Sequence, residues 1–225
     1  RFGSRAGVKP AAALGRFAID PPGLACIDVG ASPGGFTDCL LQRGARRVVA
    51  LDVGHGQLDY GLRQDERVIV LEGLNARHLT GEALAAALGP RLPLRDLRLA
   101  VVDVSFISLR LILPSCGHWP APDRLVCLVK PQFEVGPESV GRGGIVREPA
   151  LWRQALLTVA AAAPGAGWQV RDVAPSVLPG SSGNQEFFLD LERRPPAIGS
   201  GTASPVRDLQ EAVAAAIVEA AEVTP

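Results

Sequence analysis

Residues 25–41 constrain the fold most, because the sequence changes there from a strand to a glycine turn and then to a helix. The run Ala25–Val29 is apolar and contains β-branched residues, which suits a buried strand. The turn that follows holds Gly30, Gly34 and Gly35, and a residue without a Cβ permits close approach of a ligand. In α/β proteins this order places backbone N–H groups and a helix start beside a nucleotide-like ligand. We therefore expect a cofactor site here.

The glycine turn alone is a weak signal, since its spacing is not the G-x-G-x-x-G of a dinucleotide site and ligand-free tight turns are common. A second expected strand, 47–52, ends in Asp52 about 20 residues further on, where a carboxylate can accept hydrogen bonds from ribose hydroxyls. The alternative for Asp52 is a capping or solvated side chain. Together the two features favour an adenosine-containing cofactor. The residues expected to bind it follow the expected strands: Asp28, Gly30, Ala31, Ser32, Pro33, Gly34, Gly35, Phe36, Asp52, Val53, Asn75, Ala76, Arg77 and Asp103.

Strands and helices alternate along the chain, which predicts an α/β fold with a doubly wound, mostly parallel, Rossmann-like sheet of seven strands. The last two strands, 168–174 and 186–191, have no evident helix between them and are expected to form an antiparallel hairpin. Pro114 should stop or kink a helix that begins at Ser105. The glycine-rich residues 136–144 are either a flexible lid or a surface connection. The other expected strands are 68–71, 97–103 and 124–129, and the other expected helices are 11–17, 37–41, 82–88 and 149–163.

The chain is expected to divide into an entry segment with a first helix (1–20), a main domain (21–193), and a linker with a C-terminal helix (194–225). That last helix, at 206–222, is rich in alanine and either docks or stays mobile. The sequence contains no Met, so we expect it to be a fragment of a longer protein.

Composition narrows the class of protein. Lys+Arg and Asp+Glu both number 23, so the net charge carries no general nucleic-acid signature, and local basic clusters are either solvated surface or a phosphate-binding face. No charged n-region with an apolar h-region opens the sequence, and no run approaches the ~20 apolar residues of a membrane span, so we expect a cytoplasmic protein without a membrane span. No metal site is expected. Buried thiols of a reducing compartment are expected at the four cysteines, which lack C-x-x-C spacing: Cys26, Cys39, Cys116 and Cys127.

The two lysines, Lys9 and Lys130, stand out in a chain that otherwise uses arginine for its basic residues. Arginine keeps its proton, whereas a lysine can lose one, which points to acid–base work. Asp103 and Lys130 end adjacent expected strands on the edge that carries the Gly30 loop, so they can meet beside a cofactor, and Glu186 can join them. A structural ion-pair network is the competing interpretation.

Several stretches of the sequence resemble the motifs of a known protein family. Residues 28–38 resemble the cofactor loop of FtsJ-like S-adenosylmethionine-dependent RNA ribose methyltransferases. Four further stretches look like the TlyA (hemolysin A) branch of that group: 51–58, 103–109, 129–136 and 183–187. The resemblance runs from about Ser4 to Leu191 and does not cover the tail after Arg193.

The resemblance implies S-adenosylmethionine as cofactor and a catalytic tetrad of Lys9, Asp103, Lys130 and Glu186. It implies that Lys130 is the general base on a ribose 2′-hydroxyl, that Asp103 and Lys9 position or tune it, and that Glu186 orients the group or the substrate. The implied substrate is cytidine in ribosomal RNA, presented by RNA or ribosomal subunits. Members of the family usually begin with a small RNA-binding domain, and we expect the present sequence to be the catalytic domain without it.

The sequence disfavours three other functions. The older name of the branch suggests a haemolytic, membrane-active protein, which the absence of a spanning run and the acidic, alanine-rich tail helix disfavour. A nicotinamide-binding oxidoreductase is disfavoured by the glycine spacing. A ribosome-binding factor without catalysis is disfavoured by the presence of all four tetrad residues.

Overall fold

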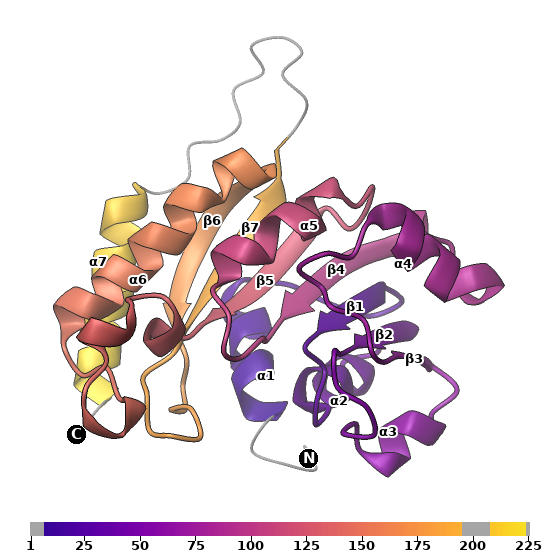
Figure 1. Ribbon diagram of the computed structural model, residues 1–225, viewed down its shortest axis with the longest axis horizontal. Coiled ribbons are helices and arrows are strands. Elements are labelled where there is room, and N and C mark those ends of the chain that lie inside the picture. Colours follow the sequence, from indigo (N-terminus) through magenta and orange to yellow (C-terminus); the bar gives the residue numbers. More distant parts are fainter. Residues whose placement is uncertain (1–6, 195–207, 224–225) are drawn as a thin grey trace, which may run out of the picture.

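The computed structural model describes residues 7–194 and 208–223, and this part of the chain forms a seven-stranded sheet with helices on both faces (Figure 1). The strand order is β3-β2-β1-β4-β5-β7-β6. The first five strands in that order are parallel, and β7 runs antiparallel to both of its neighbours. This confirms the doubly wound, mostly parallel sheet with an antiparallel C-terminal pair. The strands are β1 (Ala25–Val29), β2 (Arg47–Leu51), β3 (Val68–Leu71), β4 (Leu97–Val102), β5 (Arg124–Val129), β6 (Trp168–Pro175) and β7 (Phe187–Arg193).

The central strands are apolar along their whole length because helices cover them on both sides. Every residue of β1 is buried, and β5 is buried from Leu125 to Val129. The last strand of the chain, β7, lies between β5 and β6, so the C-terminal hairpin does not simply extend the edge of the sheet. One buried charge results: Asp190 on β7 accepts two hydrogen bonds of 2.6 Å from the guanidinium of Arg124 on β5.

The helices divide between the two faces of the sheet. On one face α1 and α2 share an apolar cluster, against which Leu62 of α3 also packs, and on the other α4, α5, α6 and α7 share a larger one. Figure 1 shows the two groups on opposite sides. The bounds are α1 (Val8–Arg16), α2 (Gly35–Gln42), α3 (Tyr60–Gln64), α4 (Gly81–Leu88), α5 (Leu113–His118), α6 (Pro149–Ala162) and α7 (Leu209–Val223).

One expected helix was wrong. Residues 103–108 after β4 form a loop, Leu109–Leu111 form a short 3₁₀ turn, and α5 begins only at Leu113. Pro114 lies in the first turn of α5, where its missing N–H has no helical partner to lose, so the proline starts this helix instead of stopping one.

The C-terminal helix docks, which settles one of the two alternatives for it. Its buried residues Ala212, Val213, Ala216 and Ala220 recur at helical spacing and pack against α6 and β6. Most of the expected linker, 195–207, lies outside the described residues.

All four cysteines are buried and free, as expected. Burial raises the pKa of the Cys26 thiol to about 12, with the Asp28 carboxylate adding to the effect, and burial likewise raises the pKa of Cys116 to about 12. In the part of the chain that the structure describes, no helix combines the length and the apolar character needed to cross a membrane.

Candidate active site

A pocket of about 430 Å³ opens at the carboxyl ends of β1, β2 and β4, where ligands bind in open α/β sheets. It lies between the glycine loop after β1 and the loop that follows β4. Its lining residues include seven of the expected cofactor residues: Gly30, Ser32, Asp52, Val53, Asn75, Ala76 and Asp103.

Gly30 shapes the floor of this pocket. Its φ is +86°, and a Cβ built on it would lie 2.2 Å from the backbone oxygen of Asp103. Its N–H also donates to the carbonyl of Leu51 over 2.8 Å. A larger residue would therefore separate the end of β1 from the end of β4, and glycine lets both strands contribute to one site.

Asp52 holds the loops on both sides of it. Its two carboxylate oxygens accept backbone N–H bonds from Ser32, over 3.1 Å, and from Gly54, over 2.8 Å. The side chain therefore caps the loops, as the alternative interpretation proposed. It also lines the pocket, and each carboxylate oxygen has a second lone pair for a ligand hydroxyl.

Asp28 is fully buried beneath the pocket floor. One carboxylate oxygen accepts a 2.7 Å bond from the Thr37 hydroxyl, and the other has no partner among the described residues. Burial raises the pKa of this carboxyl to about 7, because desolvation outweighs the stabilising bond from Thr37; the nearby Asp103 and Asp52 carboxylates add to the rise. A carboxyl group with a pKa near neutral thus lies on β1, just before the glycine loop.

The tetrad residues form two ion pairs. Lys130 Nζ lies 2.7 Å from Asp103 Oδ1 and donates to Ser105 Oγ over 2.8 Å. Asp103 also lines the pocket, so it joins the lysine to the cavity. The lysine side chain is only 12% exposed, which keeps bulk water away from most of it.

The second pair joins Lys9 on α1 to Glu186, with Nζ 2.8 Å from Oε2 and the glutamate side chain 4% exposed. Val129 pairs with Phe187 across the antiparallel strands, so the next position places Glu186 beside Lys130. The structure therefore brings all four residues to one edge of the sheet. A buried carboxylate of this kind needs its cation, because an unpaired charge is costly there.

Glu134 is a residue at this edge to which the sequence assigned no role. Its carboxylate is buried and accepts a 2.6 Å bond from Ser108 Oγ and a 2.8 Å bond from the Leu109 N–H. Burial raises its pKa, and the Ser108 bond opposes that rise. The side chain ties the loop after β4 to the turn after Lys130. The available signal was an acid a few residues beyond Lys130 in an otherwise uncharged stretch.

Phe106 is the most exposed part of the pocket wall. Its side chain is 90% exposed, its φ is +62°, and its ring lies 5.1 Å from that of Phe133. A positive φ is costly for a residue with a Cβ, so the local structure must hold the ring outward against this cost.

The glycine-rich stretch 136–144 is tied at its end. Asn184 accepts a 2.9 Å bond from the N–H of Val146 and donates a 2.8 Å bond to the carbonyl of Gly144. Asn184 is itself buried two positions before Glu186, so this stretch adjoins the tetrad.

The other expected cofactor residues lie outside the pocket wall. The side chain of Phe36 packs in the core against Phe188, and Arg77 lines a neighbouring groove. The remaining expected residues belong to the glycine loop and the start of α2: Ala31, Pro33, Gly34 and Gly35. Within residues 7–194 and 208–223, no group of three or more His, Cys, Asp or Glu side chains is arranged to hold a metal ion.

Residues 2–193 match the family described as FtsJ-like methyltransferase. The 16S/23S rRNA (cytidine-2′-O)-methyltransferase TlyA of Mycobacterium tuberculosis is 46% identical over 217 residues, which cover 96% of this chain and 76% of that protein. Hemolysin A of Brachyspira hyodysenteriae is 38% identical over 195 residues, covering 84% and 75%. A solved structure described as a hemolysin, from Streptococcus thermophilus, aligns with a TM-score of 0.84 at 40% identity, covering 99% of this chain and 75% of that one.

Proposed function

Because the chain belongs to the FtsJ-like methyltransferase family, we propose that it methylates the 2′-hydroxyl of cytidine in ribosomal RNA and uses S-adenosylmethionine to do so. The observation that carries this proposal is the double role of Asp103, which lines the pocket and pairs with Lys130. A cofactor in the pocket and a base for the hydroxyl would then share one wall. Such a substrate also implies a cytoplasmic enzyme.

The pocket wall fits a nucleoside. The carboxylate of Asp52 is suited to ribose hydroxyls, and the amide of Asn75 can bond to a base edge. Val53 and Leu74 supply apolar surface for a flat ring. S-adenosylmethionine, when bound, supplies a methyl group on a positively charged sulfur.

In this proposal Lys130 takes the hydroxyl proton. Its Nζ donates a 2.8 Å hydrogen bond to Ser105 Oγ, and Asp103 Oδ1 lies 2.7 Å away as its ion-pair partner. An amine held there in its deprotonated form would have its lone pair available for the 2′-hydroxyl. Asp103 and Ser105 would thus orient the base, which is worth a large part of the rate in a reaction of positioning.

The second ion pair has a positioning role in this proposal. Glu186 lies beside Lys130 in the strand register, and Lys9 neutralises its buried charge. The pair ties α1 to the residue that precedes β7, which would hold Glu186 in position beside Lys130. The outward ring of Phe106 offers a surface on which an unstacked base can lie, as single-stranded RNA recognition requires.

Incubation with 16S or 23S ribosomal RNA and radiolabelled S-adenosylmethionine tests the function. We expect label in one of these RNAs, at a cytidine that resists alkaline cleavage, because a 2′-O-methyl group blocks attack on the adjacent phosphate. Labelled base instead of ribose would refute the proposed acceptor. Calorimetric titration with S-adenosylmethionine, and with NAD as the control, tests the cofactor; binding of NAD alone would refute it.

The two alternative functions predict results that differ from RNA methylation. A membrane-active protein would release haemoglobin from erythrocytes without S-adenosylmethionine. A non-catalytic ribosome-binding factor would bind ribosomal subunits and leave no label in their RNA.

A further inference from the structure

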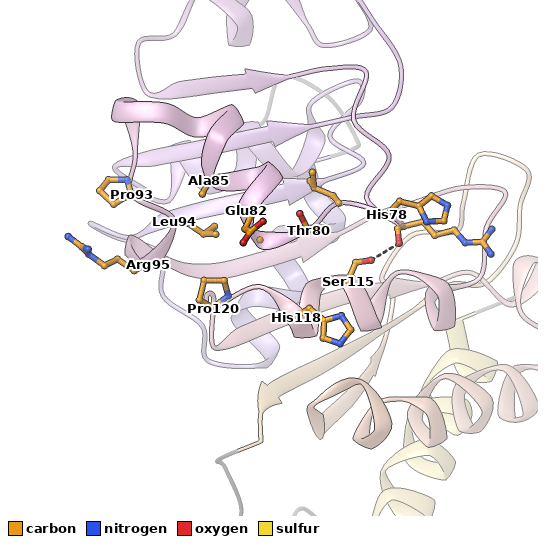
Figure 2. Close-up of a pocket in the computed structure, with 13 residues that line it drawn as sticks. His78, Thr80, Glu82, Ala85, Pro93, Leu94, Arg95, Ser115, His118 and Pro120 are labelled. Carbon is orange, nitrogen blue, oxygen red and sulfur yellow. Dashed lines mark hydrogen bonds between the residues drawn. The ribbon is translucent and has the colours of Figure 1, made fainter.

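A second hollow, which we call the α4–α5 groove, lies between α4 and α5 and has a volume of about 810 Å³. It is larger than the pocket at the reaction centre and is more open. Figure 2 shows it in close-up, with Arg95 near one end and His78 at the other. Its lining residues include Arg77, His78, Glu82, Leu94, Arg95 and His118.

Basic side chains dominate the rim of the groove. His78 stands at one end, Arg95 at the other and His118 along one wall (Figure 2). Arg77, next to His78 in the chain, also lines the groove, whereas Glu82 is the one acid among the lining residues. The chain as a whole has equal numbers of acidic and basic residues, so this local excess of positive charge is not a general property of its surface.

The two arginines are also unneutralised. Most arginines of the described chain meet a carboxylate or a carbonyl, as Arg63 does with Glu72 and Arg124 with Asp190. Among residues 7–194 and 208–223, the guanidinium groups of Arg77 and Arg95 have neither an ion pair nor a hydrogen bond. They are therefore free to bind an anion from outside the chain, and a guanidinium matches a phosphate well.

The floor between the arginines is apolar. Leu79 and Leu94 are buried there, and Pro93 and Pro120 border it. A surface of this kind, with charge at its ends and flat apolar area between, suits a nucleic-acid strand, whose phosphates and ring faces alternate.

The groove begins where the cofactor pocket ends. Asn75 and Ala76 line the pocket, and the next residue, Arg77, lines the groove. The backbone at Arg77 is anchored to α5, because Ser115 of α5 donates a 2.6 Å hydrogen bond to the carbonyl of Arg77 (Figure 2). The groove therefore begins directly beside the Asn75 end of the pocket.

We propose that the α4–α5 groove binds the phosphodiester backbone of the RNA substrate outside the target nucleotide. This inference rests on the proposed function, and it assigns the Arg77 side chain to the RNA instead of to the cofactor. Arg77 and Arg95 bind phosphates, and the apolar floor supports the sugars and bases between them.

The test measures binding of a fluorescein-labelled, cytidine-containing single-stranded RNA to the full chain with S-adenosylmethionine present. The double variant Arg77→Gln/Arg95→Gln should raise the RNA Kd about tenfold. It should also reduce the slope of log K against log salt by about 1.4, because two single-strand phosphate contacts are lost. The matched control, Arg67→Gln/Arg171→Gln, removes the same charge from exposed residues before β3 and on β6. It should change neither quantity.

A second variant should change the RNA Kd in the opposite direction, which a simple loss of structure would not do. Glu82→Gln removes the acid from the rim and should tighten RNA binding about twofold. An unchanged Kd and slope in the arginine double variant would contradict RNA binding in the groove. Equal changes of the Kd and slope in the control variant would contradict it as well. So would a loss of S-adenosylmethionine affinity in the double variant, since Arg77 would then serve the cofactor. Methylation by the wild-type protein is measured separately, so failure of the groove and failure of the proposed function give different results.

Discussion

Replacement of Asp28 by Asn tests whether this buried carboxyl group is protonated in the folded protein. The substitution keeps an oxygen for the Thr37 hydroxyl, which lies 2.7 Å from the carboxylate, and it removes the titrating proton. Any difference that varies with pH between the two proteins therefore reports the ionisation of Asp28.

The magnitude follows from the pKa. The carboxyl is fully buried, and its pKa rises from the ordinary 3.8 to about 7. The folded state thus holds the proton more tightly than the unfolded state, so the contribution of Asp28 to stability is greatest at low pH and is lost as pH rises from 3.8 to about 7. One pKa unit corresponds to about 1.4 kcal/mol, which gives a loss of about 4 kcal/mol at most across this window.

The assay is denaturant unfolding followed by the fluorescence of the buried tryptophans Trp119, Trp152 and Trp168. The free energy of unfolding is measured for both proteins at intervals from about pH 4 to pH 8. Asp28→Asn should gain stability relative to wild type as pH rises, by up to about 1.4 kcal/mol per pH unit, and the gain should level off above pH 7. Asp38→Asn on α2, whose carboxylate accepts a hydrogen bond from Gln42 at the surface, is the control. A constant difference across this range would refute a protonated Asp28 in the folded protein.

Three further outcomes are expected. Lys130→Arg should lower kcat about 100-fold or more and leave S-adenosylmethionine affinity unchanged, because arginine keeps the charge and cannot accept the proton; an active variant would remove the lysine from the proton transfer. Arg124→Ala should destabilise the fold by about 3 kcal/mol in denaturant unfolding, since it leaves Asp190 buried without a partner, and a loss below about 1 kcal/mol would contradict this. The four cysteines should resist a thiol reagent at neutral pH until the protein unfolds, because all are buried and burial raises the pKa of each thiol; rapid labelling of the native protein would show that one is accessible.

Much of the sheet could be predicted from the sequence, because buried parallel strands are short apolar runs between polar residues. The bounds of β1, β3 and β5 agree with the expected ones residue for residue. The position of Pro114 was misinterpreted, since a proline fits both the end of one helix and the first turn of the next. The five-residue helix α3 was not predicted, as it has no buried residue and thus no apolar face to recognise.

The site was predictable where strand ends determine it and not where loops do. Asp103 and Lys130 follow neighbouring parallel strands, so their meeting follows from topology. Glu186 depends on the insertion of β7 beside β5, which no local pattern encodes. Arg77 lines the α4–α5 groove and not the pocket, and its loop is held by a hydrogen bond from Ser115 of α5, 38 residues away in the chain, which no local pattern indicates.

The ion pair between Lys9 and Glu186 joins positions 177 residues apart, and this separation orders the events of synthesis. The pocket wall, from Val29 to Ile112, is made by the first half of the chain. During synthesis the N-terminus emerges first, so the residues of this wall and Lys9 are made long before Glu186. Glu186 takes its place only when β7 inserts between β5 and β6. In the proposed mechanism the tetrad is therefore complete only once the last strand of the sheet has been made.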